Sequence, residues 1–407
     1  MQAIVIGAGI GGLAAAVALR RAGAGVTVLE QSPRISEVGA GLGLGPNAVG
    51  ALTALGLAPR LDADVSLPTW TTRRRWQDGR ELFKAPLAGT VEETYGHPFW
   101  FAHRGDLQRA LLDAARDPAE PGRPAEVLLG RRVADVDPAT GTVTTTDGER
   151  FTAEAVVAAD GIRSVVRRRL FGAEEPVYAG HSGFRTQVPS ERLLGDPELA
   201  EFVERNGFES WLGPGAHVVH CPFRRGSMIN ITACIEAPAI ASGATAAPVG
   251  LDETLAHLDG WHEPLRRLIT KGNGVTRYDI YTQPALETWH TGRVSLLGDA
   301  CHPMLPYLGQ GAAQAIEDGH ALGAAFAAHP EPAAAFRAFE SLRVRRANRV
   351  QALSAANATT FHLPDGPEQQ ERDRAVAAGA TDSQVSAWLW QYQAPDRAVR
   401  DLAAVPE

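Results

Sequence analysis

The sequence predicts an α/β fold in which a domain of alternating strands and helices carries an inserted β-rich domain and is followed by C-terminal helices. Three observations lead to this prediction. Residues 3–6 form a short apolar run, followed by a glycine-rich turn and an Ala/Leu-rich segment typical of a helix. Short strand-like runs dominate between about 176 and 280. Residues 292–300 then form another apolar strand, which indicates a return to the first domain.

The composition limits the class of partner. The chain has 407 residues, of which 44% are hydrophobic, so it can bury a large core and form two domains. Its formal net charge of −8 provides no basic field to attract nucleic acid or an anionic membrane. No run of about 18 apolar residues predicts a membrane span. We therefore expect a cytoplasmic protein with a small-molecule partner, present as a monomer or a homodimer.

The first glycine-rich turn carries the strongest local motif. Gly7, Gly9 and Gly12 match GxGxxG between a strand and a helix, where they allow a tight turn, close approach of a pyrophosphate and close helix packing. The next strand-like run, VTVLE, ends in Glu30, eighteen positions after Gly12. A carboxylate there can accept hydrogen bonds from both ribose hydroxyls of an adenosine. The motif predicts a Rossmann-type unit for FAD or NAD rather than NADP, and it leaves the choice between the two open.

The segments that follow alternate between helical and strand-like patterns. Residues 104–115 have helical spacing, and residues 126–161 show turn signals between short β-rich runs, as in a hairpin or meander. In the β-rich insert, a Pro/Ala/Gly-rich loop at 237–250 precedes a helical stretch that ends near Lys271. Residues 336–357 have the spacing of a long amphipathic helix, and a short helix is expected around 386–392.

Residues 298–311, GDACHPMLPYLGQG, first suggest a Cys-His catalytic or metal site. Metal binding needs further ligands, and the sequence offers no convincing partner set; the three cysteines form no CxxC pair. We therefore predict no metal site and no structural disulfide, in keeping with a reducing compartment. A carboxylate followed by a glycine-rich helix start suits a flavin better, because negative charge accumulates on the flavin ring when it is reduced.

Three motifs in this order resemble the single-component FAD-dependent aromatic hydroxylases, which include the p-hydroxybenzoate, salicylate and 6-hydroxynicotinate hydroxylases. They are GxGxxG with Glu30, the ADGIRS turn at 159–164, and GDACHP followed by GQG. The likeness covers nearly the whole chain. It implies a discontinuous Rossmann-type FAD-binding domain (1–72, 100–175 and 278–360), an inserted substrate-binding domain (73–99 and 176–277) and a C-terminal helical tail (361–407).

The resemblance also implies the residues of the cofactor site. Gly7, Gly9, Gly12 and Glu30 would hold the ADP half of FAD, with Arg34 and Arg104 nearby. Asp160 and Arg163 would belong to the second motif, near FAD and the nicotinamide pyrophosphate. Asp299 would bind the ribityl chain, and Gly309, Gln310 and Gly311 would start the helix that faces the flavin ring.

The implied reaction is a hydroxylation. NADH or NADPH reduces the flavin, O2 adds to give a C4a-hydroperoxide, and its distal oxygen is transferred to a small aromatic or heteroaromatic substrate. Three alternatives stay open: a larger polyketide or alkaloid substrate for the same chemistry, a flavin-dependent reductase or oxidase without oxygen insertion, and a flavin-binding sensor.

The substrate pocket is the least certain part of the site. Relatives often carry a tyrosine before a proline on a strand of the substrate domain, and Cys221 takes that place here. Strand alternation puts His217 and Cys221 on one face, so both are candidates for the pocket. His302, Pro303 and Tyr307 are further candidates because they follow the flavin motif. Arg185 and Trp211 are weaker candidates for anion binding and stacking.

Overall fold

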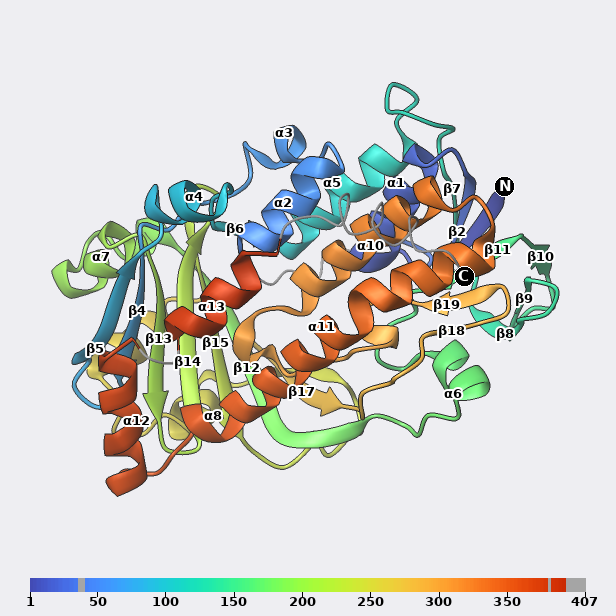
Figure 1. Cartoon of the computed structure of the whole chain (residues 1–407). Coiled ribbons are helices and arrows are strands. Elements are labelled where there is room, and N and C mark those ends of the chain that lie inside the picture. Colours follow the sequence, from blue (N-terminus) through green and yellow to red (C-terminus); the bar gives the residue numbers. More distant parts are fainter. Residues whose placement is uncertain (36–40, 380–381, 393–407) are drawn as a thin grey trace.

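The structure is a computed structural model that describes residues 1–35, 41–379 and 382–392. A parallel sheet with its helices forms one end of the molecule, and a larger sheet forms the other (Figure 1). The longest helix, α11 (Pro332–Phe361), runs between the two ends. The predicted α/β fold with a β-rich insert and C-terminal helices is confirmed.

The six-stranded sheet forms the core of the first domain. Its order is β18-β19-β11-β1-β2-β7, and all its pairs are parallel except the short β18 (His290–Thr291) with β19 (Val294–Leu296). The other strands are β1 (Gln2–Ile6), β2 (Gly25–Glu30), β7 (Glu126–Leu129) and β11 (Ala155–Ala158). The apolar runs that predicted strands at residues 3–6 and 26–30 thus belong to a buried parallel sheet.

Small residues bring the helices of this domain close together. The helices are α1 (Ile10–Arg21), α5 (Arg104–Arg116) and α10 (Gly311–Ala328). Gly319 and Gly323 of α10 face α1 so closely that an added Cβ would lie 2.7 Å and 2.6 Å from the Cβ atoms of Ala14 and Ala18. The alanine and glycine content of both segments therefore reflects the close approach of two backbones.

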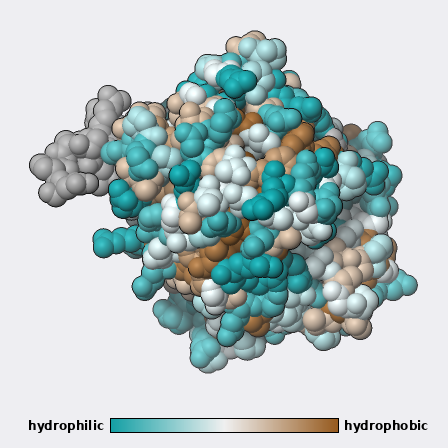
Figure 2. Space-filling view, turned by 90° about the vertical axis from the view of Figure 1, so that its right-hand side faces the viewer, coloured by the Kyte–Doolittle hydropathy of each residue, from teal (hydrophilic) through white to brown (hydrophobic). Residues whose placement is uncertain are grey.

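A three-stranded antiparallel sheet extends from this domain and matches the predicted meander. It consists of β8 (Val133–Asp137), β9 (Thr142–Thr145) and β10 (Arg150–Thr152). Helix α6 (Val165–Phe171) follows β11 and the ADGIRS turn. The end of the molecule that carries these strands has a mainly hydrophilic surface crossed by a band of apolar residues (Figure 2).

The insert forms an eight-stranded sheet in the order β16-β17-β12-β15-β14-β13-β4-β5. The strands are β4 (Trp70–Arg75), β5 (Glu81–Pro86), β12 (Val177–Pro189), β13 (Gly207–Gly213), β14 (Ala216–Phe223), β15 (Met228–Glu236), β16 (Ala246–Val249) and β17 (Val275–Thr282). Residues of α7 (Pro197–Glu204) and α9 (Glu263–Thr270) share a buried apolar cluster with one face of this sheet. The other face is left for the first domain.

Two details differ from the sequence expectations. The segment 237–250 is not only a loop, because β16 lies within it and pairs with β17. Strands β4 and β17 run across the expected domain boundaries at 72/73 and 277/278, and both belong to the eight-stranded sheet.

The remaining elements lie outside these three sheets. They are β3 (Gly41–Leu44), β6 (Trp100–His103), α2 (Pro46–Ala54), α3 (Ala58–Leu61), α4 (Thr90–Tyr95), α8 (Leu251–Ala256), α12 (Pro367–Ala377), α13 (Asp382–Trp390) and the short 3-10 turns η1 (Ser190–Arg192), η2 (Gly298–Ala300) and η3 (Pro306–Leu308). Within the described ranges, no helix is both long enough and apolar enough to cross a membrane. The end of the expected tail, 393–407, lies outside the described residues.

Candidate active site

A continuous cavity of about 890 Å³ joins the glycine turn of the first domain to the inner face of the eight-stranded sheet. Its walls come from both domains and from the last described helix, α13. A continuous space of this kind can hold a dinucleotide cofactor at one end and a small ligand at the other.

The glycine turn at the first end has the geometry its spacing predicts. An added Cβ would lie 2.4 Å from the carbonyl oxygen of Ala159 at Gly7, and 2.0 Å from the carbonyl oxygen of Gly7 at Gly12. Gly7 also has a φ of +100°, which favours glycine. Gly9 lines the cavity and would meet nothing within 4 Å, so the backbone there is open to a phosphate at the start of α1.

Glu30 stabilises this turn from the end of β2. Its two carboxylate oxygens accept hydrogen bonds from the backbone N–H groups of Ala8 (2.7 Å) and Ser32 (2.8 Å). Each carboxylate oxygen has a second lone pair, so the side chain can still accept from ribose hydroxyls. Arg34 is exposed four residues further on, beside the undescribed segment 36–40.

The ADGIRS turn at 159–164 contributes backbone rather than charged side chains to the cavity wall. One carboxylate oxygen of Asp160 accepts from the N–H of Val165 (2.9 Å) at the start of α6, and burial raises the pKa of this carboxyl. Ala159 and Gly161 line the cavity, whereas Asp160 and Arg163 do not. The guanidinium of Arg163 lies 4.9 Å from the ring centroid of Tyr281. We therefore find the backbone of this motif, rather than its charges, at the cavity wall.

Two opposite charges face the cavity from the flavin motif and from α5. The carboxylate of Asp299 faces the cavity, and protein surrounds the cavity at this point. This burial raises the pKa of Asp299, while the nearby His302 and Arg104 lower it. Burial lowers the pKa of Arg104, and the charge of Asp299 raises it. Asp299 accepts no hydrogen bond from the described residues, which leaves its oxygens available to hydroxyl groups of a ligand.

The helix start that follows also faces the cavity. Gly309 is left-handed, with a φ of +63°, and α10 begins at Gly311. Gly309, Gln310 and Gly311 all line the cavity, and the side-chain oxygen of Gln310 accepts from the amide of Asn47 (3.1 Å). The start of an 18-residue helix, whose first N–H groups have no partner within the helix, thus faces the cavity and favours negative charge there.

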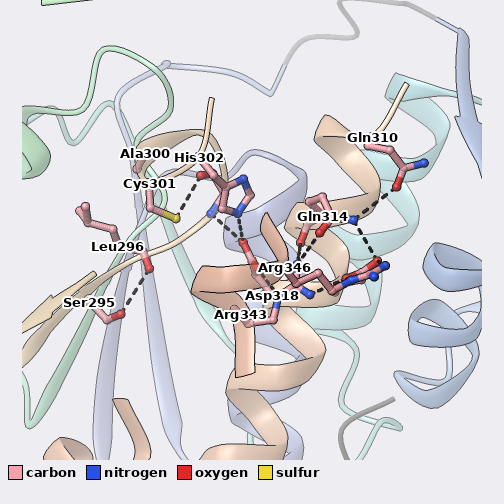
Figure 3. A network of polar contacts seen from close by, with 12 residues as sticks. Ser295, Leu296, Ala300, Cys301, His302, Gln310, Gln314, Asp318, Arg343 and Arg346 are labelled. Atoms are coloured by element: carbon pink, nitrogen blue, oxygen red, sulfur yellow. Dashed lines mark hydrogen bonds and ion pairs between the residues drawn. The ribbon is translucent and has the colours of Figure 1, made fainter. Parts of the chain in front are cut away.

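His302 and Pro303 are not where the sequence led us to expect them. His302 is fully buried, does not line the cavity, and pairs through Nε2 with Asp318 at 2.6 Å. Asp318 in turn accepts from Arg343 at 2.7 Å, within a larger buried network (Figure 3). Pro303 lies outside the cavity wall, and its carbonyl accepts from Gln351. Both residues therefore support the wall from behind.

At the substrate end, the candidates separate into two groups. His217 and Tyr307 line the cavity, with ring centroids 5.1 Å apart, and Arg185 lines it as well. Cys221 does not; it is fully buried against Phe101 and Phe223. Trp211 belongs to the apolar cluster on the opposite face of the sheet. Cys221 does share a strand face with His217, as the alternation predicts, but it is covered and does not reach the cavity.

Several cavity residues were missed. Arg73 lines the cavity and donates to the hydroxyl of Ser210 at 3.0 Å. Tyr278 lies beneath the guanidinium of Arg185, 4.5 Å from its ring centroid. Trp390 of α13 also lines the cavity. Only the alternation of Arg73 in a strand could have suggested one of these positions.

The donor set fits FAD, and comparison with known proteins agrees. A family described as FAD binding domain matches residues 1–356. The 3-amino-4-hydroxybenzoate 2-monooxygenase of Streptomyces cremeus is 38% identical over 405 residues, covering 99% of this chain and 98% of that protein. The 6-hydroxynicotinate 3-monooxygenase of Bordetella bronchiseptica is 36% identical and covers 89% of this chain and 93% of its own length.

Solved structures give the same result for the fold. A salicylate hydroxylase in complex with its substrate superposes with a TM-score of 0.81 and 26% identity, covering 100% of this chain and 98% of that chain. HpxO of Klebsiella pneumoniae, complexed with FAD and uric acid, superposes with a TM-score of 0.78 and 26% identity, covering 99% and 96%.

Proposed function

Because the chain belongs to the FAD-binding-domain family and is an FAD-dependent monooxygenase of the aromatic hydroxylase type, we propose a substrate that suits its cavity. This substrate is a small aromatic acid. The observation that carries the proposal is the presence of two arginines in the substrate end of the cavity. Arg73 comes from β4 and Arg185 from β12. Both side chains are partly buried, and a guanidinium in a cavity wall favours a planar carboxylate as its partner.

Arg185 is the stronger carboxylate ligand of the two. Its Nε is buried and has no hydrogen-bond partner among the described residues, whereas Arg73 already donates to Ser210. The stacking of Arg185 on Tyr278 fixes the plane of its guanidinium. A carboxylate bound there would complete the hydrogen bonding of Arg185.

Further polar groups of the cavity wall suit the hydroxyl or amino group of the ring. The imidazole of His217 lines the cavity, and the buried hydroxyl of Tyr307 has no hydrogen-bond partner among the described residues. A substrate that carries a carboxylate and a polar ring substituent would satisfy both the arginines and these groups. The likeness to an enzyme named for 3-amino-4-hydroxybenzoate supports this pattern.

The protein would hold FAD and the substrate next to each other in fixed orientations. Bound FAD would supply electron transfer and oxygen activation, with NADH or NADPH as the proposed reductant and O2 as co-substrate. Gly7, Gly9, Gly12 and Glu30 would hold its ADP half, Arg104 would help to hold the cofactor, and Asp299 would bind its ribityl chain. The start of α10 would stabilise negative charge beside the ring. Phe99 and Trp390, whose ring centroids are 6.0 Å apart, would exclude water from one side.

We also propose a domain division, a cellular environment and an oligomeric state. We keep the division into a discontinuous FAD-binding domain, an inserted substrate-binding domain and a C-terminal tail. The three cysteines are free and buried, which supports a reducing, cytoplasmic environment. A monomer or a homodimer is compatible with a site that one chain builds.

A substrate panel tests the function. The FAD-loaded enzyme is incubated with NADH or NADPH and with 3-amino-4-hydroxybenzoate, salicylate, 6-hydroxynicotinate or the decarboxylated analogue 2-aminophenol. We expect stimulated cofactor oxidation and a product heavier by one oxygen atom with at least one acid, and little stimulation by 2-aminophenol. Equal cofactor consumption with hydrogen peroxide release for every compound would exclude oxygen transfer.

A further inference from the structure

Three histidines and a glutamate gather beside the substrate end of the cavity. His181 of β12 and Glu236 of β15 are direct cross-strand partners, so their side chains lie next to each other on one face of the sheet. His217 of β14 pairs with Cys234, two residues before Glu236, and lies on the same face. His362 directly follows the last residue of α11 and packs against this face.

The distances within this group are short. Oε1 of Glu236 lies 3.8 Å from Nε2 of His181 and 3.7 Å from Nδ1 of His362. One ligand atom from each of these three residues lies within 4.8 Å of the other two. We propose that His181, Glu236 and His362 form a binding site for a divalent metal ion of the zinc class, with the fourth position open to water. The proposal is independent of the proposed substrate.

The hydrogen bonds around His362 favour this role. The residue is 5% exposed, and its Nδ1 has no hydrogen-bond partner among the described residues. Its Nε2 lies 2.8 Å from Nδ1 of His217. When Nε2 carries the proton and donates to His217, the lone pair of Nδ1 points toward Glu236. Metal-bound histidines commonly donate their second nitrogen in this way, which fixes the tautomer of the ring.

The distances to Glu236 need only a small adjustment. In a tetrahedral zinc site with bonds of about 2.0–2.1 Å, ligand atoms lie about 3.4 Å apart. The two distances to Glu236 exceed this value by a few tenths of an ångström. The side chain of Glu236 is 57% exposed, so it can rotate toward the ion, and it also gives an ion a path from solvent. His181 and His362 stay fixed by a strand and by the end of a helix.

A second group of possible ligands serves as an internal comparison. Cys301, His302 and Asp318 also lie close together, but all three are fully buried. Asp318 is already paired with Arg343 and with His302. Its negative charge is therefore neutralised within the protein, and the exposed group with Glu236 is the better metal site.

An ion at the proposed site would have a structural consequence. It would tie the end of α11 to strands β12 and β15, and it would fix the ring of His362. Because His362 is bonded to His217, which lines the cavity, the ion would hold one wall of the substrate end.

A zinc titration tests the proposal. The FAD-loaded full chain is treated with EDTA, exchanged into buffer, and titrated with zinc chloride in competition with a chromogenic chelator. We expect one tight site per chain, and we expect His181→Asn and Glu236→Gln each to weaken binding at least tenfold. Glu191→Gln, which removes an exposed carboxylate elsewhere, and Cys301→Ser should bind zinc as the wild type does. The flavin absorbance of each variant reports whether it is folded.

Two further measurements separate this site from the alternatives. X-ray absorption at the zinc edge should show nitrogen and oxygen ligands with imidazole scattering; a sulfur shell at about 2.3 Å would place the ion at Cys301 and overturn the proposal. Zinc should raise the melting temperature of the wild type but not of His181→Asn, because only a folded site can bind it. Equal zinc affinity in the wild type and in both cluster variants would also overturn the proposal. So would a wild type that takes no zinc from the chelator.

Discussion

Replacing Arg343 with methionine should destabilise the protein strongly. Arg343 is fully buried and donates to Asp318 at 2.7 Å, to the side-chain oxygen of Gln314 at 2.7 Å and to Glu317. Both carboxylates are fully buried, so the substitution leaves a negative charge without its cation. Breaking a buried pair in this way costs about 3–5 kcal/mol. Arg346 still pairs with Glu317 at 2.8 Å, so we expect a value near the lower end.

The assay compares two variants of the same helix. Urea unfolding of the FAD-loaded enzyme, followed by flavin fluorescence and by circular dichroism, gives the loss in free energy of unfolding. Arg345→Met is the matched control, because Arg345 is exposed two residues further along α11 and should change the free energy by less than about 0.5 kcal/mol. A loss below about 1 kcal/mol for Arg343→Met would refute the reasoning that this network is energetically coupled.

Four further predictions address the site and its support. Gly12→Ala places a Cβ 2.0 Å from the carbonyl oxygen of Gly7, so we expect a purified protein with little bound flavin, measured by the ratio of flavin to protein absorbance. Asp299→Ala removes the carboxylate that would accept ribityl hydroxyls, and hydrogen bonds to a charged group are worth about 1.5–3 kcal/mol, so the FAD dissociation constant should rise about 10- to 150-fold in a fluorescence titration. Arg185→Met should weaken the binding of a carboxylated substrate about 10- to 100-fold and leave 2-aminophenol unaffected; equal effects on both ligands would contradict a carboxylate contact. Pairing with His302 and Arg343 in the folded state lowers the pKa of Asp318 to about 2 from an ordinary 3.8. The contribution of Asp318 to stability should therefore be complete above about pH 5 and be lost as the pH falls toward 2. Urea unfolding at several pH values should show that acid lowers the free energy of unfolding less in Arg343→Met than in the wild type.

The parts of the site that one short segment builds could be predicted from the sequence. Gly7, Gly9 and Gly12 act through backbone geometry, and Glu30 ends the next strand, so spacing alone placed them correctly at one turn. The helix start at Gly311 followed in the same way from the glycines before it. Such features depend on residues within a few positions, whose conformations limit each other directly.

The side chains that depend on distant partners could not be placed. His302 follows the flavin motif directly, yet Asp318 and Arg343 draw it into a buried network behind the wall. Cys221 shares a face with His217, but Phe101 and Phe223 cover it. Neither outcome has a local signal, because Asp318 and Arg343 belong to other elements than His302, and Phe101 lies more than a hundred residues before Cys221.

The sequence by itself therefore determined the fold class, the family, the cofactor and the geometry of the glycine turn. The tertiary structure alone decided which polar side chains meet at the substrate end. Strand β4 pairs in parallel with β13, more than a hundred residues later, and this pairing brings Arg73 beside Ser210 at the cavity. The end of α11 brings His362 to the same sheet. Backbone turns are specified by local sterics, whereas the lining of a cavity is specified by the packing of remote segments, which a single sequence does not display.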